Sequence, residues 1–252
     1  SCRSLTDAVR MMDADLTSRT SMLEARFLAG SNLVFADFQD RMWKALQGRR
    51  SQQYIQLKLQ EQAQRHAKYG GSVYLQEPNV KEGPGGLRDF HTALWVARAR
   101  HRLDDLKALP ALGLLTPVEL AQCLLSLDFL LRVRSELHYL HGGKSDVLSL
   151  SLQVPVAANL GFRDEATYGV ERFMQQYFLR AGALHQLSGR LVERCVARPG
   201  SHVEAVMKKL RARDIGDEFT EINRQIHILP AQRHCFREDP IRLLKIFWYC
   251  LE

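Results

Sequence analysis

The segment that begins at Thr116 limits the possible folds more than any other part of the chain. Thr116 is a good N-cap residue, Pro117 suits the first helical position, and Glu119 completes a capping box. Leucines then recur at helical spacing until a Gly-Gly pair ends the pattern. The sequence therefore predicts a long amphipathic helix over about residues 117–140, and such a helix needs other helices to cover its apolar face.

Further segments show the same helical periodicity. Phe35, Phe38, Met42 and Leu46 follow one another at offsets of three or four and predict an amphipathic helix that ends near Gly48. The same signals predict helices over residues 17–30, 51–69 and 165–195. A helix of about 30 residues is typical of bundles. The predicted fold class is mainly α, a helical bundle with at most one short strand near residues 72–76.

Two other segments are less regular. Residues 148–161 start with the alternation of a strand, but Pro155 and the run to Gly161 favour a short helix. The sequence ARPGS at 197–201 predicts a linker. Beyond it we expect a charged helix, then a loop around Leu229-Pro230, and finally an apolar helix that is capped at Asp239 and truncated at the last residue.

Composition limits the function classes. The chain has 252 residues, of which 46% are hydrophobic, so a sizeable core is expected. Its five cysteines are scattered without a CxxC pair, which is typical of a reducing compartment. No signal peptide or membrane-length apolar run is found. The net charge of +7 is spread among acidic residues, which favours a solvated basic face over nucleic-acid binding. We expect a soluble, cytoplasmic protein with neither nucleic acid nor membrane as partner.

Short catalytic patterns occur, but their spacing is unfavourable. Gly30-Ser31 followed by Asp37 and Asp40 is faintly similar to the signature of nucleotidyltransferases, whose paired aspartates bind two metal ions. Those aspartates stand one residue apart on a strand, whereas Asp37 and Asp40 lie in a predicted helix. No metal-ligand spacing of histidines and no nucleophile elbow occurs. The sequence therefore assigns no catalytic and no metal-binding residue.

The segment EPNVKEGPGGLRD at residues 77–89 is more detailed than a connector between helices requires. Its glycines allow backbone N–H groups to face an anion, and Gly86 precedes a predicted helix, whose N-terminus attracts phosphate. The alternative is a rigid loop in which Lys81, Glu82, Arg88 and Asp89 pair with one another. A glycine-rich turn alone does not decide between the two.

The surrounding residues carry a resemblance to a known family. The run RHAKYGGSVYLQEPNVKEGPGGLRDFHTALW at residues 65–95 resembles the bacterial bifunctional uridylyltransferase/uridylyl-removing enzymes, which modify the nitrogen-regulatory PII protein. The resemblance extends to SMLEARFLAG, RSELH and VERFMQQY, and to IRLLKIFW near the last residue. It covers nearly the whole chain.

The resemblance implies a domain order. The family has a nucleotidyltransferase domain, a helical region, a metal-dependent phosphohydrolase domain of the HD type, and two ACT domains that sense glutamine. On that map, residues 1–70 would be the last part of the nucleotidyltransferase domain, 71–197 the helical module, and 198–252 a linker and the start of the HD region. The transfer motif would precede the chain and the hydrolase motif would follow it, so the isolated chain is expected to be inactive.

The resemblance also implies site residues within the 77–89 segment, as nucleotide-binding candidates. These are Asn79, Lys81, Glu82, Gly83, Gly85, Gly86, Arg88 and Asp89. The resemblance also makes Arg134 and His138, four residues apart on one helical face, secondary candidates; the residues alone favour a satisfied, partly buried histidine at His138. The chain departs from the family pattern at Gly142-Gly143-Lys144, where glycine-arginine is expected, and retains Asp146.

The implied function is uridylylation of PII with UTP and Mg²⁺, and hydrolytic removal of UMP when glutamine is plentiful. The partners implied are PII, UTP and, through other domains, glutamine. In this scheme the helical module closes over the nucleotide, with Lys81 or Arg88 near its phosphates. The competing hypothesis is a non-catalytic helical scaffold that positions domains or binds PII.

Overall fold

The computed structural model describes residues 4–103, 105–164, 167–197, 213–214, 219–222, 225–228, 239 and 241–242. The chain divides into two units, Ser1–Ala197 and Arg198–Glu252. The assignment of its parts to nucleotidyltransferase, helical and HD domains stays a prediction.

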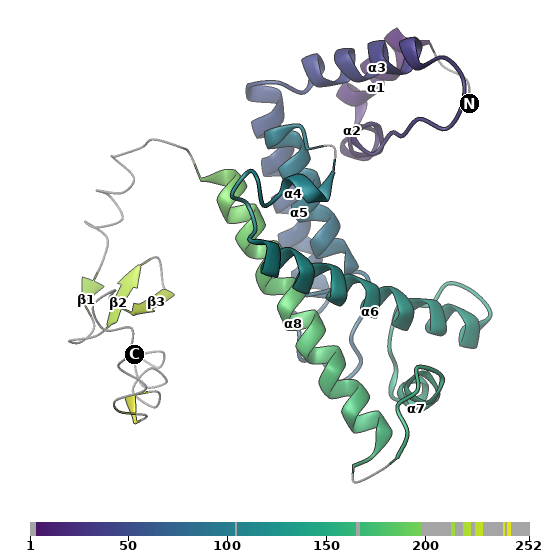
Figure 1. The fold of residues 1–252 in the computed structure, drawn as a ribbon, viewed down its shortest axis with the longest axis vertical. Helices are drawn as coiled ribbons and strands as arrows, with labels where there is room; N and C mark the ends of the chain where they lie inside the picture. The colour runs from purple at the N-terminus through teal and green to yellow at the C-terminus, as the bar shows by residue number, and fades with distance from the viewer. Residues whose placement is uncertain are drawn as a thin grey trace. The chain divides into compact units, whose positions relative to one another are not determined.

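The first unit is helical, which confirms the predicted mainly-α class (Figure 1). Its elements in the described residues are α1 (Leu5–Ala14), α2 (Leu16–Leu23), α3 (Asn32–Ala45), α4 (Arg49–Lys68), α5 (Leu87–His101), a 3-10 turn (Leu106–Ala108), α6 (Pro117–His141), α7 (Leu150–Asn159) and α8 (Gly169–Val196). The predicted helices near residues 35–48, 51–69, 117–140 and 148–161 are therefore confirmed as α3, α4, α6 and α7.

Helix α6 shows why the strongest sequence signal was reliable. The Thr116 hydroxyl accepts the Glu119 N–H, and the Glu119 carboxylate accepts the Thr116 N–H at 2.8 Å. The same carboxylate pairs with Arg190 and Arg194 of α8 at 2.9 and 3.1 Å. The hydrogen bond from the Thr116 backbone is the main reason that the pKa of Glu119 falls to about 2. The residue that caps α6 therefore also links α6 to α8 through ion pairs.

The core of this unit is built around α5. Its residues Ala93, Val96 and Ala97 are fully buried, and α5 packs against α4, α8, α6 and α2. Helix α8 in turn packs against α6 and α7, so the two long helices α6 and α8 and the central α5 form one bundle (Figure 1). Because other helices surround α5, residues 77–86, which directly precede it in the chain, lie against the bundle.

Two helix boundaries differ from the predictions. Helix α2 ends at Leu23 and not at Gly30; Glu24 is its C-cap residue, and the Glu24 carboxylate accepts the Trp95 indole N–H at 2.8 Å. Helix α8 begins at Gly169, whose N–H donates to the Asp164 carboxylate at 2.6 Å. Apolar periodicity therefore overestimated the length of both helices.

The strands lie elsewhere than the sequence suggested. Residues 72–76 form no strand. In the second unit, β1 (Arg213–Asp214), β2 (Phe219–Ile222) and β3 (Gln225–Ile228) form an antiparallel sheet in the order β1-β2-β3, with Phe219 opposite Ile228. The charged helix predicted after the linker, the loop at Leu229-Pro230 and most of the final apolar helix lie outside the described residues.

Two further findings concern the described part of the chain. No helix there is long and apolar enough to cross a membrane. Cys123 and Cys195 are buried free thiols, and burial raises their pKa to about 12 and about 11. Neither thiol is therefore activated for chemistry.

Candidate functional site

The glycine-rich loop, residues 77–86, lies between α4 and α5 in the chain and contacts residues of several helices. The Val80 N–H donates to the Asp146 carbonyl at 2.8 Å, and the Leu148 N–H donates to the Pro78 carbonyl at 2.9 Å. These bonds join the loop to the segment between α6 and α7. The Glu77 carboxylate accepts the Leu150 N–H at 2.8 Å, which caps α7.

The glycines of the loop are required by close backbone packing. Gly85 has a φ of +73°, and a Cβ there would lie 2.4 Å from the Ala181 carbonyl oxygen of α8. A Cβ on Gly86 would lie 2.7 Å from the Val80 carbonyl oxygen. Both contacts are with backbone atoms, which cannot move aside cheaply. The glycines therefore let the loop fold on itself and against α8.

The loop amides donate inside the protein. The Gly83 N–H donates to the Asn79 carbonyl at 3.0 Å and the Gly86 N–H to the Gly83 carbonyl at 2.9 Å. The Gly85 N–H donates to the Asp89 carboxylate at 2.8 Å. Of the two alternatives left by the sequence, this geometry favours a rigid loop as the role of the glycines. Any anion at this site would be bound by side chains.

The Asp89 carboxylate accepts hydrogen bonds from five donors. We call Asp89 and these donors the Asp89 centre. The Asp89 side chain is 1% exposed. The donors come from two helices and the loop: Gln62, Arg65 and His66 of α4 at 3.1, 2.7 and 2.7 Å, His185 of α8 at 3.2 Å, and the Gly85 N–H at 2.8 Å. One carboxylate thus connects α4, α5, α8 and the loop.

The ionisation of Asp89 follows from this arrangement. Burial opposes the charged form, but hydrogen bonds from His185, His66 and Arg65 outweigh it and hold the pKa of Asp89 far below its usual range. The carboxylate is therefore charged at any physiological pH. A buried charge of this kind is stable only with its partners in place.

Asp146 forms a second and more open group, the Asp146 centre. Its carboxylate lies 2.7 Å from Arg134 Nε, 3.2 Å from His138 Nε2 and 3.8 Å from Lys81 Nζ. Burial raises the pKa of Asp146, and the bonds from Arg134 and His138 lower it by more, so the net shift is downward. The three side chains that face Asp146 are each about a third exposed, at 29–31%.

Glu82 joins the two centres. Its carbonyl accepts a 2.7 Å bond from Arg65 of the Asp89 centre, while its carboxylate lies 3.5 Å from Lys81 and 3.4 Å from Arg88. Arg88 also lies 5.5 Å from the centre of the Trp95 ring. The network therefore runs from α4 through the loop to α6.

The structure brings most of the predicted site residues together. Lys81, Glu82, Arg88 and Asp89 share this network, and Asp146 brings in the secondary candidates Arg134 and His138. Asn79 has a local role, because its side-chain oxygen accepts the N–H groups of Lys81 and Glu82 at 3.1 and 2.7 Å. Gly83, Gly85 and Gly86 are buried within the loop.

Sequence reasoning missed all four side-chain donors of the Asp89 centre, of which Gln62 is one. Arg65 and His66 open the run that carries the family resemblance, so their place in it was an available signal. His185 lies 96 residues from Asp89 in the chain. Nothing in the local sequence around His185 marked that contact.

The residues near Asp89 and Asp146 do not gather as a metal site. The described part of the chain holds no group of three or more His, Cys, Asp or Glu side chains arranged for a metal ion. Each of the two carboxylates instead faces an arginine, which repels a cation. A metal required for chemistry would thus need ligands other than these two centres.

Comparison with known proteins gives a consistent result. A model of the family described as GlnD PII-uridylyltransferase matches residues 53–192. The chain is 37% identical over 249 residues to the bifunctional uridylyltransferase/uridylyl-removing enzyme of Cereibacter sphaeroides, covering 98% of this chain and 27% of that protein. The enzymes of the same name from Novosphingobium aromaticivorans and Rhodospirillum rubrum are 36% and 34% identical over 250 residues, covering 98% and 97% of this chain.

The chain spans about a quarter of the length of these relatives, 27% and 26% of the latter two. No solved structure matches it. The family match includes α5, α6, α7, most of α4 and α8, and both carboxylate centres. From this match over more than half of its length, we conclude that the chain belongs to the GlnD PII-uridylyltransferase family.

Proposed function

We propose that this chain is the helical substrate-side module of an enzyme that transfers UMP from UTP to the PII protein and removes it by hydrolysis, in the cytoplasm. Family membership supports the reaction class. Residues 1–70 would complete the nucleotidyltransferase domain and residues 198–252 would lead into the HD domain. Mg²⁺ would supply charge neutralisation at the phosphates, held by residues outside the two centres, and glutamine would act through other domains.

The observation that supports this role is the long distance between the charged groups of its partly exposed ion pairs. Lys81 Nζ lies 3.5 Å from Glu82 and 3.8 Å from Asp146, and Arg88 lies 3.4 Å from Glu82. Strong charge-assisted bonds are shorter, about 2.7–2.9 Å. Lys81 and Arg88 are held near one place by carboxylates that bind them weakly. They can therefore exchange these partners for a phosphate at small cost.

The rigid part of the network explains how such side chains are positioned. Asp89 anchors the first turn of α5, on which Arg88 stands, and the loop that carries Lys81 is bonded to Asp146 through backbone and side chain. Positioned cations stabilise charge that develops in phosphoryl transfer without reorganising during the reaction. The proposal assigns Lys81 and Arg88 to the UTP phosphates and leaves Gly83, Gly85 and Gly86 to shape the loop.

The test is steady-state kinetics of a full-length uridylyltransferase that contains this segment. Lys81→Ala and Arg88→Ala should each reduce kcat/KM for UTP by about tenfold or more, since each removes a charge-assisted contact. Arg132→Ala, an exposed arginine of α6, is the matched control and should leave kcat/KM unchanged. The helical circular dichroism of all three variants should equal that of the wild type.

The scaffold hypothesis gives a different result in the same experiment. If the module only positions domains, Lys81→Ala and Arg88→Ala will leave KM for UTP and turnover at the wild-type level. That outcome would reject the nucleotide-binding role. Loss of PII binding without a change in UTP affinity would favour an interaction surface instead.

A further inference from the structure

Trp95 of α5 has more contacts than its place in the core requires. It is 4% exposed, yet Arg88 and Lys58 both lie over its ring, at 5.5 and 4.5 Å from the ring centre. Its indole N–H donates to the Glu24 carboxylate at 2.8 Å. A buried indole usually finds one hydrogen-bond partner, but filling the core does not require two cations over the ring.

The spacing along α5 places Trp95 on the same helical face as Arg88. The two residues are seven positions apart, about two turns of an α-helix, and His91 lies between them on that face. The His91 and Trp95 rings are stacked, with centroids 5.9 Å apart and an interplanar angle of 23°. Burial is the main reason that the pKa of His91 is lowered. A neutral ring, and not another cation, therefore stands beside Arg88 at neutral pH.

Arg88 depends on this ring because its other charged contact is weak. Among the described residues, its ion-pair partner is Glu82 at 3.4 Å, a longer distance than the roughly 2.7–2.9 Å of a strong charge-assisted bond. A planar guanidinium over a tryptophan face is attracted to the ring and lies in a defined orientation. The ring therefore makes the more specific of the two contacts.

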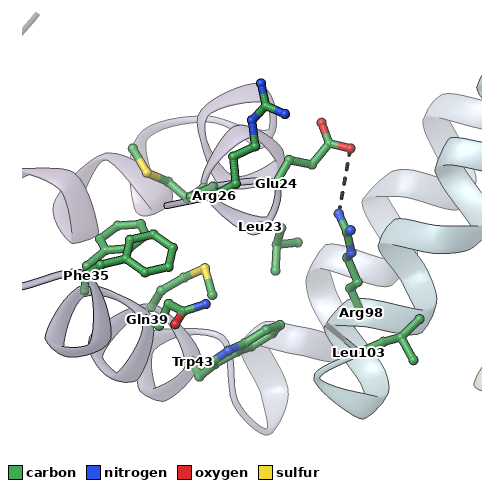
Figure 2. Close-up of a pocket in the computed structure, with 12 residues that line it drawn as sticks. Leu23, Glu24, Arg26, Phe35, Gln39, Trp43, Arg98 and Leu103 are labelled. Atoms are coloured by element: carbon green, nitrogen blue, oxygen red, sulfur yellow. Dashed lines mark ion pairs between the residues drawn. The ribbon is translucent and has the colours of Figure 1, made fainter. Parts of the chain in front are cut away.

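Glu24 fixes the orientation of the indole. It is the C-cap residue of α2, and its carboxylate lies 3.9 Å from Arg98, one turn beyond Trp95 on α5. Figure 2 shows this ion pair between the end of α2 and α5, beside a hollow that both residues line. Rotation of the indole would break its charge-assisted bond to the carboxylate. The end of α2 is thus connected to Arg88 through one side chain.

We propose that Trp95 is a positioning residue for Arg88: Glu24 fixes the indole, and the indole holds the guanidinium over its face, in place for the UTP phosphates. The inference rests on the proposed function for the role of Arg88, and it assigns no substrate contact to Trp95. Glu24 lies in the part of the chain assigned to the nucleotidyltransferase domain. A change at the end of α2 therefore reaches the transfer site through two side chains.

The experiment is a double-mutant cycle between Trp95 and Arg88 in the full-length uridylyltransferase. Trp95→Leu removes the aromatic face and should lower kcat/KM for UTP by about fivefold. In the Arg88→Ala background the same change should lower it by less than about twofold, because the residue it acts through is already absent. KM for PII should stay at the wild-type value. Equal losses in both backgrounds would mean that Trp95 acts only through stability, and would overturn the proposal.

Two further variants keep the test independent of core packing. Trp95→Phe retains an aromatic face and should keep about half of the wild-type kcat/KM for UTP. Glu24→Leu, at an exposed site, removes the indole acceptor and should lower kcat/KM by about threefold, with no further loss in the Arg88→Ala background. Glu193→Leu, at another exposed glutamate on α8, is the matched control and should have no effect. If Glu24→Leu behaves like this control, the proposal is rejected.

Nuclear magnetic resonance separates a failure of this inference from a failure of the proposed function. In the ¹⁵N-labelled 252-residue chain, the ring current of Trp95 should move the Arg88 Nε–H signal upfield, and Glu24→Leu should reduce that shift. If both are seen but Arg88→Ala leaves kcat/KM unchanged, Trp95 positions Arg88 and the assignment of Arg88 to the phosphates fails. If Arg88→Ala lowers kcat/KM but Glu24→Leu changes neither signal nor kinetics, the proposed function stands and this inference fails.

Discussion

The Asp89 and Asp146 centres use the same chemistry in different surroundings. Each consists of a carboxylate that accepts from an arginine and from histidine, and each has a lowered pKa. Asp89 is 1% exposed and Asp146 is 20% exposed. Burial makes the first group a structural connection among helices, whereas partial exposure allows the cations of the second to change partners.

The largest effect on this comparison should come from acid, which reduces the contribution of both carboxylates to the free energy of unfolding. A carboxyl group whose folded pKa is lowered contributes stability above its unfolded pKa, near 4, and loses it as pH falls toward the folded value. Asp89, Asp146 and Glu119 all have lowered pKa values. The urea midpoint, followed by circular dichroism, should therefore fall steadily below about pH 4. A midpoint that stays constant down to pH 3 would contradict the charge assignments.

The next largest effect should come from Asp89→Asn. This change leaves Arg65 buried without its carboxylate, and breaking a buried pair costs about 3–5 kcal/mol. Urea unfolding at pH 7 measures the loss. Asp128→Asn, at an exposed site on α6, removes the same charge and should change stability by less than about 0.5 kcal/mol. A loss under about 1 kcal/mol for Asp89→Asn would mean that the centre is not structural.

Gly85→Ala tests how much the close packing of the loop against α8, beside the Asp89 centre, contributes to stability. Positive φ and the approach to the Ala181 carbonyl should together cost about 2–3 kcal/mol. Gly71→Ala is a matched control, because Gly71 also has a positive φ, +66°, but no atom lies within 4 Å of its added Cβ. Its cost should be about 1 kcal/mol, from backbone strain alone. Equal losses in thermal unfolding would show that the contact with α8 is unimportant.

The smallest effect is expected for Asp146→Asn. Its partners are partly exposed, so the loss should be about 1 kcal/mol or less. Because exposed charges are screened by salt and buried ones hardly at all, 0.5 M NaCl should shrink this loss but not that of Asp89→Asn. Urea unfolding of both variants at low and high salt measures the difference. If the loss of stability in Asp146→Asn does not depend on salt, the Asp146 centre behaves as a buried group like the Asp89 centre.

Much of the helical framework could be predicted from the sequence. The capping box at Thr116 and the apolar periodicity of α3 are local signals, and local signals determined those helices correctly. Helix boundaries were less predictable: α2 ends at Leu23 and not at the predicted Gly30. The sheet of the second unit was also missed, since its strands are two to four residues long and carry little periodic signal.

The candidate site was predictable as a set of residues, but its organisation was not. The sequence by itself determined the bundle class, the family and the segment 77–89, because helix capping, apolar spacing and a long motif are encoded in neighbouring residues. Only the tertiary structure decided that the glycines pack against Ala181, that His185 meets Asp89, and that Asp146 faces Lys81. Those contacts join residues far apart in the chain, and the burial that separates a rigid carboxylate from an adaptable one exists only after the helices have packed.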